Sequence, residues 1–184
     1  YAITVRAGKN VIPGIKTNIS GKTLTIENEN TCNWIRSYET PIEVYLEMPA
    51  IDSILYESSG NLTSLNRFSG DSIRLEVLEG AGSIKLWLDM QKSRFNLHYG
   101  TADLSVRGYS HICYLYSGGY GPADLRDLNT VFHYMTNNST NDCHVRASLE
   151  LQVKIHNVGD VYYYGDPVSV SLEGDGSGKL YKRQ

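Results

Sequence analysis

Tyrosines are the side chains of this sequence that are best suited to bind a ligand. The 184 residues include 14 tyrosines but only three phenylalanines. A phenol ring combines an apolar face with a hydroxyl that forms hydrogen bonds, and both sugar rings and protein surfaces can use this combination. We expect some of these rings to form an exposed strip flanked by Asn and Asp, and the others to pack in the core or between strands. The candidate ligand-binding residues are Tyr114, Tyr116, Tyr162, Tyr163 and Tyr164. Tyr120, on the same coil as Tyr114, and Tyr134, on the next coil, are further tyrosines expected to be exposed.

A glycine-rich stretch near the C-terminus resembles a phosphate loop but matches it poorly. Three residues rather than four separate Gly174 from Gly178, and Leu180 stands where a Ser or Thr is required. No helix is expected to follow, so we interpret this stretch as a turn. The sequence also contains no G-x-S-x-G motif. It therefore predicts no catalytic residues, no cofactor and a protein that is not an enzyme.

The histidines and turn aspartates do not have the spacing of a metal site. No two of the five histidines stand two or four residues apart. His98, His133 and His156 each precede a predicted corner, so stacking of coils could bring them together. The turn aspartates recur too far apart for a calcium-binding nonapeptide repeat. We interpret these residues as strand-surface histidines and turn aspartates, and we predict no metal site.

The three cysteines, Cys32, Cys113 and Cys143, have neither zinc-site nor C-x-x-C spacing. They allow at most one internal disulfide, for which Cys113–Cys143 is the candidate. The alternative is that all three are small buried apolar residues, as free cysteines usually are.

Charge and hydropathy exclude two classes of partner. The formal net charge is -3, and 17 Lys and Arg are dispersed among 20 Asp and Glu. No basic face for phosphates follows, so we predict no nucleic-acid partner. Wholly apolar runs are only a few residues long, so we predict no transmembrane segment.

Period-2 strands separated by Gly, Asn and Asp turns position these side chains. Residues 1–50 contain irregular strand candidates, among them Ala2–Ala7, Thr23–Glu27 and Ile42–Glu47, with a turn or bulge at Pro13-Gly14. From residue 51 the pattern repeats. The first apolar residues after successive turns are separated by 22, 20, 19, 20, 18 and 19 residues, and they are Leu62, Ile84, Leu104, Ala123, Cys143, Val161 and Leu180.

A strand-only period near 20 favours an all-β, single-stranded β-solenoid, a β-helix-like fold with about seven coils of 18–22 residues. An antiparallel meander folded as a sandwich is the alternative. We expect a single domain over residues 1–184, with a short helical turn conceivable only at Asp124–Asn129. Gly, Asn and Asp at the corners are attributed to their tolerance of positive φ.

Three segments carry a resemblance to a known family. They are Asn28–Arg36, Pro41–Leu46 and Gly159–Pro167, and the repeated Gly-Ser-Gly-like turns add to them. With them the chain resembles, over nearly its whole length, the head GIN domain family of auto-transporter adhesins from Bacteroidetes-type bacteria. The resemblance implies a right-handed β-solenoid, exported and often anchored as a lipoprotein through a lipid outside this chain. Departures at Gly118–Pro122 and Asn137–Asp142 are expected to distort the neighbouring corners.

No catalytic residues come with this family, whose molecular function is not established. We therefore predict a non-enzymatic exported module at the cell surface, associated with the outer membrane, or in the periplasm. It would have an adhesin-like or scaffold role and bind a glycan or protein through a strand face. The alternatives are a carbohydrate-active enzyme with acidic residues converging beside exposed tyrosines, and a structural spacer that self-associates through an open coil end.

Overall fold

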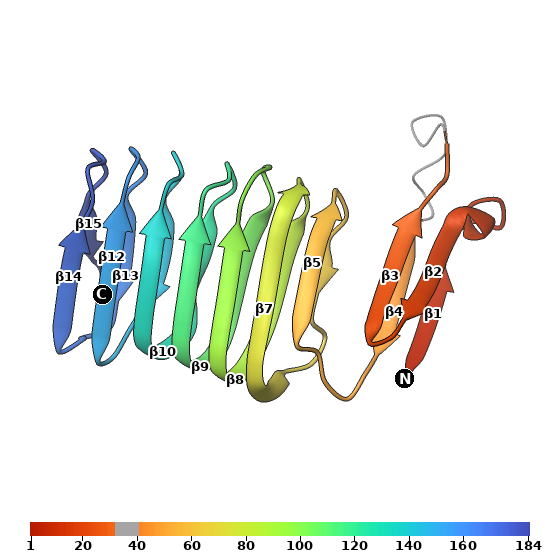
Figure 1. Cartoon of the computed structure of the whole chain (residues 1–184), viewed down its shortest axis with the longest axis horizontal. Helices are drawn as coiled ribbons and strands as arrows, with labels where there is room; N and C mark the ends of the chain where they lie inside the picture. The colour runs from red at the N-terminus through yellow and green to blue at the C-terminus, as the bar shows by residue number, and fades with distance from the viewer. Residues whose placement is uncertain (32–40) are drawn as a thin grey trace. The chain divides into compact units, whose positions relative to one another are not determined.

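A computed structural model describes residues 1–31 and 41–184. The chain divides into two compact units, Tyr1–Pro49 and Ala50–Gln184. Figure 1 shows the irregular strands of the first unit and the repeats of the second. Most of the predicted loop Asn28–Arg36, with Cys32 and Trp34, lies outside the described residues.

The N-terminal unit consists of two antiparallel strand pairs. β1 (Ala2–Arg6) pairs with β4 (Glu43–Glu47), and β2 (Ile15–Ser20) pairs with β3 (Thr23–Asn28). The predicted turn at Pro13-Gly14 is a short 3-10 helix, η1 (Ile12–Gly14). Its first turn accommodates proline, which has no backbone N–H, because an N–H at that position would have no partner within the helix. None of the described residues of this unit is buried, so its strands lack a core of their own.

The C-terminal unit is a β-solenoid of about six turns built from parallel stacked coils. Each coil passes through a back layer and then a front layer, and turns connect it to the next coil (Figure 1). Its strands are β5 (Ser53–Ser58), β6 (Leu62–Thr63), β7 (Phe68–Gly80), β8 (Ser83–Leu97), β9 (Asp103–Ser117), β10 (Ala123–Asn137), β11 (Cys143–Arg146), β12 (Glu150–Ile155), β13 (Val161–Tyr164), β14 (Ser169–Glu173) and β15 (Leu180–Lys182).

The long strands β8 to β10 bend and contribute to both layers. The front layer consists of β5, β12, β14 and the C-terminal halves of β7 to β10. The back layer consists of β6, β11, β13, β15 and the N-terminal halves of β8 to β10. Inward residues alternate with outward ones along each strand, so the core lies between the two layers.

The apolar ladder predicted from the turn spacing is present residue for residue. Each of its members is the register partner of the next, from Leu62 opposite Ile84 to Val161 opposite Leu180. All of these pairings are parallel, which confirms the solenoid and excludes the antiparallel sandwich for this unit. We call this stack the first core ladder; its members are Leu62, Ile84, Leu104, Ala123, Cys143, Val161 and Leu180.

The helical turn considered at Asp124–Asn129 is wrong, because the segment lies within strand β10. Asp124 pairs with Ser105 but Asp127 pairs with Arg107, so β10 contains one extra residue at this point. Such a bulge allows Leu125 and Leu128, three residues apart, to be buried together. That spacing imitates a helical period in the sequence.

The cysteines confirm the buried apolar interpretation where the structure describes them. Cys113 and Cys143 are free and buried, in the front and back layers respectively, so the candidate disulfide is wrong. Burial raises the pKa of Cys113 to about 12 and that of Cys143 to about 11, which keeps both thiols protonated.

Side-chain hydrogen bonds replace glycine in the turn at Asn137–Asp142. Asn137 donates through Nδ2 to the carbonyl oxygen of Gly159 at 3.0 Å, and Ser139 Oγ donates to that of Gly119 at 2.6 Å. The strands on both sides keep their register, with Ala123 opposite Cys143 and Asn137 opposite Ile155. The expected distortion is therefore absent from the strand pairing at this turn.

Replacing Gly108 with alanine is expected to lower the free energy of unfolding by about 2–3 kcal/mol. Gly108 has φ +111°, and an added Cβ would overlap the carbonyl oxygen of Leu88 on the neighbouring coil. Gly70→Ala is the matched control, since the nearest atom to its added Cβ is Met90 Sδ at 3.8 Å. Urea unfolding of both variants tests this, and equal stabilities would contradict it.

Candidate functional site

The five candidate tyrosines lie in two separate places. Tyr114 and Tyr116 point outward from the front layer on β9. Tyr162 and Tyr164 lie on the outer side of the back layer on β13, whereas Tyr163 between them packs against the core. The structure thus does not bring the five rings into one strip.

Tyr134, which the sequence also marks as an exposed tyrosine on the next coil, completes the front-layer group. It is the register partner of Tyr114, and the two rings stack with centroids 5.3 Å apart and planes inclined by 27°. Burial, followed by the nearby Glu150 carboxylate, raises the pKa of the Tyr134 phenol. The hydroxyl therefore remains a hydrogen-bond donor at neutral pH.

A shallow pocket of about 210 Å³ opens beside these rings on the outer surface of the front layer. Two columns of register partners border it, and each column crosses four coils. One column is Arg94, Tyr114, Tyr134 and Gln152, and the other is Asn96, Tyr116, Thr136 and Lys154. At about 4.8 Å per coil the pocket extends roughly 14 Å along the solenoid. Its lining residues, all in the described part of the chain, include no carboxylate.

Cations lie at both ends of this pocket. At one end, Arg94 Cζ lies 4.9 Å and Lys92 Nζ lies 5.4 Å from the centroid of the Tyr114 ring. These distances are within the range of cation–π attraction. At the other end, Lys154 forms an ion pair with Glu173 at 3.2 Å.

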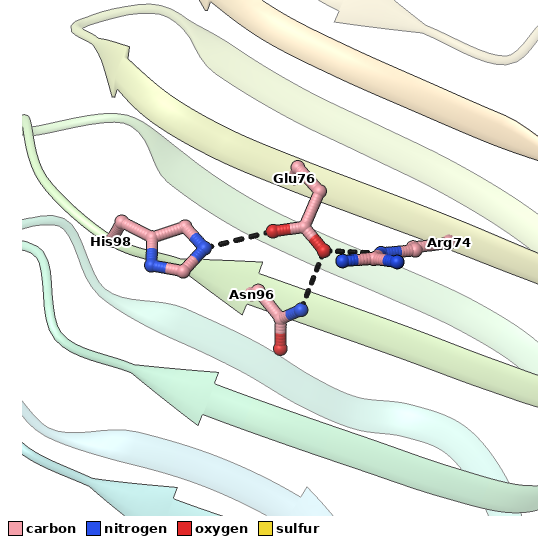
Figure 2. A network of polar contacts seen from close by, with 4 residues as sticks. All are labelled: Arg74, Glu76, Asn96 and His98. Atoms are coloured by element: carbon pink, nitrogen blue, oxygen red, sulfur yellow. Dashed lines mark hydrogen bonds and ion pairs between the residues drawn. The ribbon is translucent and has the colours of Figure 1, made fainter.

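Glu76 organises a polar network on the coils before the pocket (Figure 2). Its carboxylate accepts hydrogen bonds from His98 at 2.8 Å, from Asn96 at 2.6 Å and from Arg74. Burial alone would raise the pKa of Glu76, but these hydrogen bonds and the Arg74 charge outweigh it and lower the pKa. The His98 ring also contacts Tyr116, with centroids 5.7 Å apart. The network therefore holds the Asn96 and Tyr116 side of the pocket in place.

The back-layer tyrosines form a second aromatic group. The His144, Tyr162 and Tyr181 rings stack in register, with centroids 5.1 and 5.4 Å apart. Tyr164 lies under Arg126 and Arg146, each 5.8 Å from its centroid. Burial, aided by the Arg126 charge, lowers the pKa of His144. The rings of this group pack mainly on one another and on arginines.

The histidines that stacking could have brought together are apart. His98 binds Glu76, His156 lies 2.7 Å from Asp175, and His133 is buried in the core. In the described residues no three His, Cys, Asp or Glu side chains gather in a way that could hold a metal ion. Nor does any helix in that part of the chain have the length and apolar character needed to cross a membrane.

Sequence reasoning missed Arg94 and Gln152. Arg94 stands 20 residues before Tyr114, as Ile84 stands before Leu104, so projecting every outward residue onto the ladder intervals would have found it. The same projection continues the column with the buried residues His133 and Val153, because it takes no account of the extra residue in β10 or of the shorter coil that follows, and so it would not have found Gln152. The Glu76 network gives a weaker signal, because Arg74 and His98 need particular rotamers to meet the carboxylate.

The comparisons with known proteins agree with this architecture. The family model described as "Putative auto-transporter adhesin, head GIN domain" matches residues 1–167. The crystal structure of a "putative adhesin" from Bacteroides fragilis is similar, with a TM-score of 0.88 and 19% identity over 98% of this chain and 82% of that one. No curated protein matches the chain. These findings confirm the resemblance drawn from the sequence and support an adhesin-like role and export. The chain belongs to the head GIN domain family of auto-transporter adhesins.

Proposed function

We propose that this protein is a non-enzymatic exported module that binds a glycan through the front-layer pocket. The stacked pair Tyr114 and Tyr134, set beside amide and hydroxyl side chains in a recess, is the observation that supports this best. Sugars present apolar C–H faces and many hydroxyls, so they need aromatic surface and hydrogen-bonding groups together. Asn96, Thr136 and Gln152 provide the second requirement.

The size and charge of the recess favour a glycan over the alternatives. A standard protein interface buries about 800 Å² on each partner around an apolar centre, whereas this recess is small and polar. Hydrolysis of a glycosidic bond generally needs a pair of carboxyl groups across the bond. The described lining of the pocket provides none. A surface or periplasmic location, with a lipid anchor outside this chain, fits an adhesin-like module.

Tyr134→Ala is expected to abolish the rise in melting temperature that a bound glycan produces. A ligand at 100 times its Kd stabilises the folded state by about 2.7 kcal/mol, which corresponds to a shift of several degrees. Removing one ring of the stacked pair deletes the aromatic wall on one coil. The measurement is a thermal-shift screen of the 184-residue chain against an array of neutral and acidic glycans.

Tyr162→Ala provides the matched control, because it removes the same ring from the back layer. It should retain the full shift with the same glycans. Loss of the shift in Tyr162→Ala but not in Tyr134→Ala would move the site to the back-layer group. If no glycan on the array shifts the wild-type melting temperature, the glycan proposal is wrong.

A further inference from the structure

Two cations converge on one ring at the N-terminal end of the front-layer pocket. Lys92 and Arg94 stand two residues apart on β8, so both side chains leave the same side of the strand. Both end over the Tyr114 ring, at 5.4 and 4.9 Å from its centroid. Both positive charges therefore lie beside one ring at the edge of the recess, and they repel one another.

These two cations differ from the others around the pocket because they have no counter-charge. Arg74 pairs with Glu76, and Lys154 pairs with Glu173. In the described residues, no carboxylate lies within ion-pair distance of Lys92 or Arg94. An anionic group placed between them would relieve their repulsion and gain two charge-assisted hydrogen bonds.

From this geometry we infer that the glycan taken by the pocket is an acidic saccharide whose carboxylate binds Arg94 and Lys92. This inference rests on the proposed function. The guanidinium of Arg94 can engage a carboxylate through two parallel hydrogen bonds, which fixes the orientation of the sugar that carries it. The remaining sugars would extend along the two columns toward Gln152 and Lys154, a length of roughly 14 Å.

The charge of the rest of the chain favours a single carboxylate over a long polyanion. The chain has a formal net charge of -3, with acidic and basic residues dispersed. Glu76, Glu150 and Glu173 all lie on the same outer surface as the pocket. A densely charged polymer such as a nucleic acid would meet Glu150 and Glu173. One acidic sugar at the Lys92 and Arg94 end would lie closest to Glu76, whose charge Arg74 already offsets.

The test uses pairs of sugars that differ only, or nearly only, in the acidic group. Trigalacturonic acid and sialyllactose are each compared with their carboxyl methyl esters, by calorimetric titration of the 184-residue chain. For at least one pair the acidic member should bind about tenfold more tightly or better. Arg94→Gln and Lys92→Gln should each weaken binding of the acidic member more than that of the neutral member, and so remove most of that difference.

Lys85→Gln is the control for net charge, since it removes one positive charge from the exposed surface of the back layer. It should leave both affinities as in the wild type. Equal binding of acidic and neutral members would overturn the inference while the proposed glycan function stands. Binding of neither member in any pair would contradict both. A preference for the acidic member that survives in Arg94→Gln and Lys92→Gln would place the carboxylate elsewhere and also overturn the inference.

Discussion

Leu104→Ala is expected to lower the free energy of unfolding by about 3–4 kcal/mol, measured by urea denaturation followed by circular dichroism. Leu104 is 1% exposed in the first core ladder, between Ile84 and Ala123 on the neighbouring coils. Removing its branched side chain forfeits the transfer free energy and leaves a cavity. The small side chain of Ala123 cannot close that cavity, because strand pairing fixes the distance between coils.

Leu180→Ala makes the same chemical change at the end of the same ladder. Leu180 is half-buried and has a register partner, Val161, on one side only. The loss should be about 1 kcal/mol, because part of its surface is already in water and the last coil can relax. Ser105→Ala, on the outer side of β9, should change stability by less than about 0.5 kcal/mol. Similar losses for Leu104→Ala and Leu180→Ala would show that the loss of stability does not depend on the burial of the ladder residue.

The stacking order of the coils could be predicted from the sequence because it depends on two short-range properties. Alternation fixes which residues point inward, and the turn spacing fixes how many residues separate equivalent positions. Together they determine the partners of Leu62, Leu104 and Val161 without any knowledge of side-chain conformation. Tolerance of positive φ accounts for fewer of the corner glycines than the sequence analysis expects. Gly82 and Gly121 lack positive φ, and are required because a Cβ would overlap a carbonyl oxygen of the preceding coil.

The candidate site was predictable only in part, because it depends on which layer each strand occupies. Tyr114 and Tyr162 both follow the alternating pattern, yet they belong to opposite layers. The sequence marks corners clearly where a turn contains glycine, but β10 contains no glycine and β9 contains only Gly108. The division of the tyrosines into two groups follows from the bends in these strands. The inward direction of Tyr163 follows instead from alternation, because Tyr163 stands two residues after Val161 of the first core ladder.

Protonation of His133 is expected to lower the free energy of unfolding of the solenoid at a pH where most surface groups change that free energy little. His133 is fully buried in the front layer, with Cys113 and Leu151 as register partners. Its Nδ1 lies 3.3 Å from the carbonyl oxygen of Arg146, and no group among the described residues forms a hydrogen bond with its buried Nε2. Burial lowers its pKa from 6.5 to about 4, because the charged imidazolium would lose its hydration. The Cys113 thiol remains uncharged over this range and cannot offset that charge.

A lowered histidine pKa has no effect on the free energy of unfolding above pH 6.5, where neither state binds the proton, and lowers that free energy below pH 6.5. As the pH falls toward 4, the unfolded chain takes up the proton and the folded chain does not, so the free energy of unfolding should fall by about 3 kcal/mol. His133→Leu removes this titration, and the Arg146 carbonyl still accepts a hydrogen bond from Thr130. We therefore expect urea unfolding between pH 7 and 4 to show a much shallower loss of stability in His133→Leu than in the wild type.

His111→Gln, on the outer surface, should keep the wild-type dependence of stability on pH. If wild type and His133→Leu lose stability in parallel, the buried imidazole is not the source of the acid sensitivity, and protonation of carboxylates such as Glu76 must account for it.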